Sequence, residues 1–135
     1  MSNLPIFDVA GSAMQAQSVR LSTVASNLAN ANTVAGSPEG AYRARQPVFI
    51  AEAVPDNPAL SGVRVAEVRE STAAPVKRYD PGNPLADAQG YVYAPDVDPV
   101  AQMVDMISAS RSYQANVEVF NSAKELAVAT LNMGR

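Results

Sequence analysis

Apolar residues recur at every third or fourth position through the first thirty residues of the chain. The spacing follows the alternation of three and four that is typical of a coiled-coil seam, and only Gln17 within it is polar. Pro5 suits a first helical turn, where its missing N–H is not needed. The pattern predicts a helix from about Pro5 to about Ala31. Its seam consists of Phe7, Ala10, Met14, Gln17, Leu21, Val24, Leu28 and Ala31.

The last segment of the chain has the same periodicity. Asp98 followed by Pro99 is typical of an N-cap and a proline at the first helical position, and Gly134 is a plausible stop. Further apolar residues lie beside the seam and widen the apolar face, so this helix needs more than one neighbour. The seam positions predicted here are Met103, Met106, Ser110, Tyr113, Val117, Phe120, Lys124, Ala127 and Leu131.

Residues 35–96 have a different pattern, with frequent proline and glycine between short β-branched or alternating runs. Four such runs, at 42–51, 62–69, 75–79 and 90–93, predict a small sheet that needs support from the helices. The predicted fold is therefore α+β, with two long terminal helices and a small β-rich middle domain. The predicted units are 1–34, an N-terminal assembly helix, 35–96, the β-rich domain, and 97–135, a C-terminal assembly helix.

Charge is scarce on the first predicted helix, because residues 1–34 contain only Asp8 and Arg20. Small, uncharged side chains of this kind allow close helix approach, whereas a buried unpaired charge is costly. Two interpretations are open at this point: lateral packing in an assembly, or a solvated polar face that is poor in charge. The residues expected on the outer face are Ser12, Gln15, Ser18, Ser22, Thr23, Ser26, Asn27, Asn30, Asn32 and Thr33.

Composition narrows the range of functions. Hydrophobic residues make up 47% of the chain and charged residues 17%, and the net charge is −3 with ten Lys and Arg, which gives no basic footprint for nucleic acid. Histidine and cysteine are absent, which removes thiolate nucleophiles, histidine bases and nearly every zinc site. We therefore expect no enzymatic activity, cofactor or metal. No run of apolar residues is long enough for a membrane span, and the N-terminus lacks the pattern of a cleaved secretory signal.

A few residues could still suggest a ligand site. The segment 80–90 offers oxygen ligands, but it lacks the alternating carboxylates and distal glutamate of a calcium loop, so it is predicted to be a turn. Tyr113 and Phe120 lie on the seam, which favours core packing over an aromatic binding platform. For Arg111, a solvated charge and an anchor between subunits are equally supported.

The segment Ser22-Thr-Val-Ala-Ser-Asn-Leu-Ala-Asn-Ala-Asn-Thr33 resembles the N-terminal signature of bacterial flagellar axial proteins. Residues 98–126, which include Asp105-Met-Ile-Ser-Ala-Ser-Arg-Ser-Tyr-Gln-Ala-Asn116, resemble the FlgC family of proximal-rod subunits in the flagellar basal body. Two middle segments, 42–49 and 79–92, agree with that family, so the resemblance covers nearly the whole chain. Residues 34–40 and 53–61 look variable and carry no family role.

The resemblance implies that the two terminal helices form an antiparallel, coiled-coil-like pair. It also implies a structural subunit of the proximal rod that polymerises through these helices. The rod would be a drive shaft that crosses the periplasm, transmits torque and surrounds the export channel. The implied partners are further copies of the chain, other rod subunits, the rod-to-ring adaptor, the membrane ring and the flagellar type III export apparatus, which uses no cleaved signal peptide. The alternatives are another axial subunit of the flagellum and a secreted helical adaptor that does not polymerise.

The two seams, the uncharged face and the resemblance together define a predicted assembly interface. Asn27 and Asn30, at i and i+3, are expected to point the same way from the helix. An Asn27→Asp change is therefore expected to leave the isolated subunit nearly as stable as before. The predicted interface residues are Phe7, Met14, Leu21, Val24, Asn27, Leu28, Asn30, Met103, Met106, Arg111, Tyr113, Val117, Phe120 and Leu131.

Overall fold

The structure is a computed structural model that describes residues 5–54 and 57–134. Two long helices enclose a β-rich middle in chain order, which confirms the predicted α+β class. The elements are α1 (Pro5–Asn30), β1 (Arg45–Val54), β2 (Asn57–Glu70), β3 (Val76–Tyr79), β4 (Tyr91–Ala94) and α2 (Pro99–Met133).

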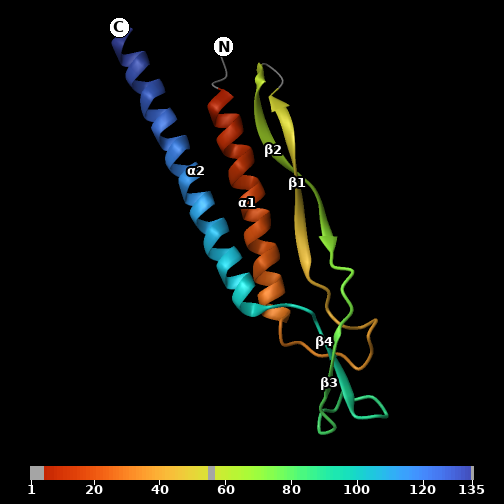
Figure 1. Ribbon diagram of the computed structural model, residues 1–135. Helices are drawn as coiled ribbons and strands as arrows, with labels where there is room; N and C mark the ends of the chain where they lie inside the picture. The colour runs from red at the N-terminus through yellow and green to blue at the C-terminus, as the bar shows by residue number, and fades with distance from the viewer. Residues whose placement is uncertain (1–4, 55–56, 135) are drawn as a thin grey trace.

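The two helices form an antiparallel pair, as predicted. Near the start of α1, the Phe7 ring packs edge-to-face on Phe120 with centroids 4.8 Å apart. Further along, Arg20 forms an ion pair with Asp105 of α2. Because residue numbers rise along α1 while those of their partners fall along α2, the helices run in opposite directions. Figure 1 shows them side by side, with the C-terminal end of α2 continuing past the start of α1.

The start of α2 follows the predicted chemistry. Asp98 is in an extended conformation, and its Oδ1 accepts a hydrogen bond from the backbone N–H of Val100 at 2.9 Å. Pro99 occupies the first turn, where it leaves no unsatisfied N–H. Gly134 follows the last helical residue. The N-terminal capping signals are therefore confirmed, and the helix ends at the predicted Gly134, whose φ of −90° is not the left-handed conformation that favours glycine.

The strands form two separate two-stranded antiparallel sheets rather than one small sheet. In the β1–β2 hairpin the pairs run from Arg45↔Glu70 to Val54↔Asn57. A bulge interrupts the register where Val48 pairs with Glu67 but Phe49 pairs with Val65. Ala66 is the extra residue, and such a bulge bends and twists a strand. β2 starts at Asn57, so the hairpin is longer than the predicted runs.

The β3–β4 hairpin is shorter and lies at the other end of the molecule, where α1 ends and α2 begins (Figure 1). Its pairs run from Val76↔Ala94 to Tyr79↔Tyr91. An isolated bridge between Ala35 and Tyr93 attaches the segment after α1 to this hairpin. The small sheet is therefore fixed at the end of the helix pair rather than along its side.

The β1–β2 hairpin lies along α1, on the side away from α2 (Figure 1). The hydroxyl of Ser12 accepts a hydrogen bond from the backbone N–H of Val63 at 3.1 Å. At Gly62 an added Cβ would come within 2.8 Å of the same hydroxyl oxygen, so glycine permits this close approach. Helix α1 is thus the central element, with α2 on one side and the hairpin on the other.

The buried core is small and consists mostly of small side chains, which let the elements approach closely but remove little apolar area from water. Many large apolar side chains remain exposed, far more of them on α2 than on α1. Contiguous exposed apolar surface marks interaction sites in soluble proteins. The buried hydrophobic residues are Ala10, Ala16, Val24, Ala31, Ala41, Val54, Val92 and Ala109.

Candidate assembly surfaces

Asn27 lies inside the subunit, with 1% of its surface exposed. Its side-chain N–H groups donate to the backbone carbonyl of Arg45 at 2.8 Å and to the side-chain oxygen of Gln102 at 3.0 Å. Its oxygen accepts from the backbone N–H of Arg45 at 2.8 Å and from the Tyr42 hydroxyl at 2.9 Å. The expectation that Asn27 lies on an outward face is wrong, because the start of β1 and the first turn of α2 cover it.

Asn30 does not share the environment of Asn27. Its side chain is half-buried and donates to the backbone carbonyl of Ser26, one turn earlier on α1, at 2.9 Å. The Ser26 hydroxyl lies 3.1 Å from the Tyr42 hydroxyl. Residues at i and i+3 are about 60° apart around a helix, and here the edge of the buried face falls between them.

The outer face of α1 is narrower than predicted. Ser12, Thr23 and Asn27 face covered sides of the helix, because the β1–β2 hairpin and the segment before it occupy that space. The sequence could not show this, since a polar side chain suits a hydrogen bond to a strand as well as contact with water. Ile6 and Asp8 are exposed in the first turn of α1, and from Gln15 onward its exposed surface is a line of small or uncharged residues, Gln15, Ser18, Ser22, Ala25 and Ala29.

The contact line of α2 differs from the predicted seam at alternate positions. Ala109 is fully buried, while the predicted neighbour Ser110 is half-buried, and Gln102 contacts Asn27 where Met103 was predicted. At these alternate positions small or polar residues replace the predicted ones, while Met106 and Phe120 stay on the contact line as predicted. The buried or half-buried line on α2 is Gln102, Met106, Ala109, Asn116, Phe120, Ala123 and Ala127.

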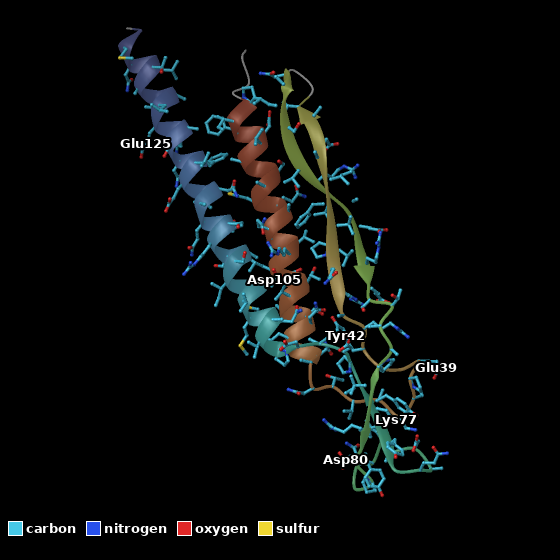
Figure 2. All side chains as sticks on the ribbon, in the orientation of Figure 1. Glu39, Tyr42, Lys77, Asp80, Asp105 and Glu125 are labelled. Carbon is cyan, nitrogen blue, oxygen red and sulfur yellow. The ribbon has the colours of Figure 1, made fainter. Side chains whose placement is uncertain are left out.

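Polar groups occupy much of the contact between the helices. The Arg20–Asp105 ion pair and the Asn27–Gln102 hydrogen bond lie in the half nearer β3–β4. Gln17, the polar residue of the α1 seam, has its side-chain oxygen buried without a hydrogen-bond partner in the described part of the chain. Figure 2 labels Asp105 where the helices run side by side and Tyr42 in the segment that leads from α1 to β1.

The remaining predicted interface residues fall into two groups. Most are buried or half-buried in the subunit and belong at least in part to its own packing: Phe7, Met14, Leu21, Val24, Leu28, Met106, Val117 and Phe120. The others are exposed: Met103, Arg111, Tyr113 and Leu131. The structure thus brings the first group together and leaves the second available to other molecules.

An apolar patch covers the outer side of the first turns of α2. Val100, Met103, Val104 and Ile107 are 50 to 67% exposed and recur at the spacing of one helix face. We call these four residues the outer patch. It lies on the opposite side of α2 from Ala109, so α1 cannot cover it. Arg111 continues the same face and is exposed.

The far end of α2, residues 121–133, continues past the contact between Phe7 and Phe120, and we call it the projecting end. Four of its apolar side chains, Leu126, Val128, Leu131 and Met133, are 49 to 81% exposed. Successive residues of a helix are 100° apart, so these four point to different sides. A helix segment that is apolar on several sides needs partners on several sides.

The 80–90 segment is a compact turn, as predicted. Asp87 Oδ1 accepts hydrogen bonds from the backbone N–H groups of Gln89 and Tyr91, each at 2.9 Å, and Oδ2 accepts from the Tyr93 hydroxyl at 3.2 Å. These bonds, with that of Tyr91 the largest cause, hold the pKa of Asp87 below its usual value. Gly90 adopts a φ of +83°, which glycine accommodates at no steric cost. The carboxylate therefore organises the turn.

The described residues contain no group of three or more metal-ligating side chains and no helix long and apolar enough to cross a bilayer. Residues 7–36, which include most of α1, match the family model for the flagella basal body rod protein. Residues 88–133, which include β4 and α2, match the model for the flagellar basal body rod FlgEFG protein C-terminal region.

Curated relatives match over the full length. The flagellar basal-body rod protein FlgC of Escherichia coli O157:H7 is 56% identical, and that of Salmonella typhimurium is 55% identical, each over the whole of both chains. FlgC of Aquifex aeolicus is 44% identical over 121 residues, which cover 88% of this chain and 87% of the relative. The chain belongs to the FlgC family of flagellar basal-body rod proteins.

The match to the FlgC family includes the two helices that carry the exposed faces. The resemblance found in the sequence is therefore confirmed, both in its signature segment and in α2. Sequence reasoning missed the roles of Tyr42, Arg45 and Gln102, which surround Asn27. The Asp98 N-cap indicated that Gln102 lies in the first turn of α2. Its partner Asn27 is 75 residues away in sequence, so no local pattern connects the two.

Proposed function

We propose that this chain is a structural subunit that polymerises into the flagellar basal-body rod through exposed faces of α1 and α2. The observation that carries the proposal is the apolar outer surface of α2. A soluble monomer rarely leaves a contiguous group such as Val100, Val104 and Ile107 in water. Membership of the FlgC family supports a rod as the assembly that covers this surface.

Two separate apolar regions on one helix suit a repeating contact. The outer patch lies at the start of α2 and the projecting end at its finish, so the two regions suit contacts with different subunits. Contacts between different surfaces of successive subunits generate rings or helical filaments. The uncharged exposed line on α1 offers a third surface, on which close approach costs no buried charge. We propose that Met103, Arg111, Tyr113 and Leu131 act at contacts between subunits.

The rod assignment extends to location and partners. We propose that the subunit acts in the part of the rod that crosses the periplasm and that it is exported without a cleaved signal peptide. Its neighbours would be further copies, other rod subunits, the rod-to-ring adaptor and the membrane ring, and the export apparatus would deliver it. Full-length similarity to relatives named FlgC favours this rod subunit over another axial protein or a non-polymerising adaptor.

The test uses Ile107→Asp, which places a carboxylate in the centre of the outer patch. In the isolated subunit the side chain is already 56% exposed, so the free energy of unfolding should change by no more than about 0.5 kcal/mol. In an assembled rod the carboxylate would be buried in every copy, and each burial would cost about 3 kcal/mol of assembly free energy. We expect a folded, exported subunit, few recovered basal bodies and non-motile cells.

The matched control is Ala74→Asp, an exposed residue between β2 and β3. It introduces the same charge away from both helices and should leave motility unchanged. Normal basal bodies and swimming in cells that carry only the Ile107→Asp chain would contradict assembly through this surface. A melting curve for each purified variant separates failed assembly from failed folding.

A further inference from the structure

We propose that Asn27 makes the docking of β1 on α1 and the docking of α2 on α1 depend on each other. This coupling is a property of the single subunit and goes beyond its proposed role in the rod. It rests on the four hydrogen bonds of one buried amide, which reach β1, α2 and the segment between α1 and β1.

The hydrogen-bonding capacity of this amide is fully used. A side-chain amide has two donor hydrogens and two acceptor lone pairs. The two hydrogens of Asn27 go to Arg45 O and Gln102 Oε1, and the oxygen receives Arg45 N–H and Tyr42 O–H. All four distances lie between 2.8 and 3.0 Å. Turning the amide over would set oxygen against oxygen, so one orientation satisfies all partners.

The two bonds to Arg45 place the start of the hairpin. They engage the N–H and the C=O of the first residue of β1, in the way that a neighbouring strand would. The bond to Gln102 places the first turn of α2 against the same group. A single planar amide therefore determines where both elements begin relative to α1.

Among the described residues, the other tertiary hydrogen bonds and ion pairs do not link these two elements. Ser12 holds the middle of β2 on α1, while Arg20 and Phe7 hold α2 on α1. In the described part of the chain, α1 is the close backbone neighbour of the hairpin and of α2, which are not close neighbours of each other. Both elements bind the Asn27 amide. If a shift of β1 or α2 displaces this amide, a buried polar group of the other element loses its hydrogen-bond partner.

Hydrogen exchange on the purified wild-type chain and its variants tests this coupling. In Gln102→Met the side chain keeps its length but loses the acceptor for Asn27. We expect the backbone amide of Arg45, on a different element, to exchange about five- to tenfold faster, as loss of one hydrogen bond implies. The amide of Val63, bonded to Ser12, should change much less, and this ratio separates local opening from global unfolding.

Coupling between two sites is reciprocal, so a change on the hairpin side of the Asn27 amide, at Tyr42, should alter hydrogen exchange in α2. Tyr42→Phe removes the hydroxyl donor to Asn27, and we expect faster exchange of the Gln102 backbone amide, which donates to Asp98 O at 3.0 Å. Matched controls are Gln114→Met on the exposed side of α2 and Tyr79→Phe on β3. Neither should alter exchange at Arg45 or Gln102.

A cycle with Asn27→Ala completes the test. In the Asn27→Ala background, Gln102→Met should change the exchange rate of the Arg45 amide by no larger a factor than that of the Val63 amide. The proposal is overturned if Gln102→Met alters α2 and leaves the Arg45 amide at the wild-type rate, or if the effect on Arg45 persists without Asn27. All measurements use unassembled subunit, so either result leaves assembly through the outer patch to be judged separately.

Discussion

Helices α1 and α2 have similar apolar periodicity in sequence but very different surroundings in the subunit. The buried residues of α1 are Ala10, Ala16, Thr23, Val24 and Asn27, whereas Ala109 is the buried residue of α2 among those described. The hairpin and α2 cover two sides of α1, while α2 has α1 along one side (Figure 1). Periodicity thus indicates that a helix has an apolar face, but not whether its own chain covers that face.

The exposed faces of the helices also differ in chemistry. The open line of α1 consists of small, uncharged residues such as Ser18, Ser22 and Ala25. The outer side of α2 changes from the apolar outer patch to a region that contains Arg111 and Glu118. Close packing between backbones suits the first surface, and apolar burial bordered by charge suits the second. Changes to the buried side of α1 should therefore alter the subunit, and changes to the exposed face of either helix should alter assembly.

The largest expected effect comes from Asn27→Asp. A carboxylate there faces the carbonyl of Arg45 and the side-chain oxygen of Gln102 and no longer donates to either. We expect the free energy of unfolding to fall by about 3 kcal/mol, measured by urea denaturation. Asn32→Asp, at an exposed position just after α1, is the control and should change it little. Equal stability of both variants would mean that α1 is not buried on this side.

Ala109→Leu tests the contact between the helices. Ala109 is fully buried, so three extra carbons must displace α1 or adopt strained rotamers. We expect a loss of about 2 kcal/mol, seen as a lower melting temperature. Ala101→Leu places the same side chain on an exposed part of α2 and should have no comparable effect. A stable Ala109→Leu subunit would show that the line of α2 facing α1 is misassigned.

Gly62→Ala tests the contact of α1 with the hairpin. The added Cβ would lie 2.8 Å from the Ser12 hydroxyl oxygen, which also donates to the carbonyl of Val9. Either the hydroxyl or β2 must move, and we expect a loss of about 1 kcal/mol. Gly82→Ala, where nothing lies within 4 Å of the new Cβ, is the control. If both variants unfold at the same denaturant concentration, the hairpin does not approach α1 closely at this point.

The smallest effect concerns the turn at 80–90, which belongs to neither helix. Because the pKa of Asp87 is lowered on folding, its contribution is complete above the unfolded-state pKa of about 4 and is lost as pH falls through the folded value. Asp87→Asn should therefore reduce the dependence of unfolding free energy on pH below about 4. Exchange of amides in α1 and α2 should be similar in both proteins. An unchanged acid profile would contradict this role for Asp87.

Much of the fold could be predicted because its signals are local. Asp98 and Pro99 determine where α2 starts, since a capping carboxylate bonds a backbone N–H two residues later. The four strands lie near the predicted runs, with β1 and β2 extending beyond them. The division into two sheets was not predicted, because pairing depends on partners and not on the alternation within a strand. The family was also predictable, because its signature segments are contiguous in sequence.

The sequence by itself determined two long helices, the N-cap of α2 and its apolar surplus, and the resemblance to the FlgC family predicted the antiparallel pairing. Only the tertiary structure decided which residues meet. Asn27 could equally suit an outer face, because its amide bonds water as readily as Arg45, and only the approach of β1 and α2 removes the water. The apolar face of α2 is wide enough for several contact lines. Close approach to α1 favoured the line through Ala109, which has small or polar side chains at alternate positions.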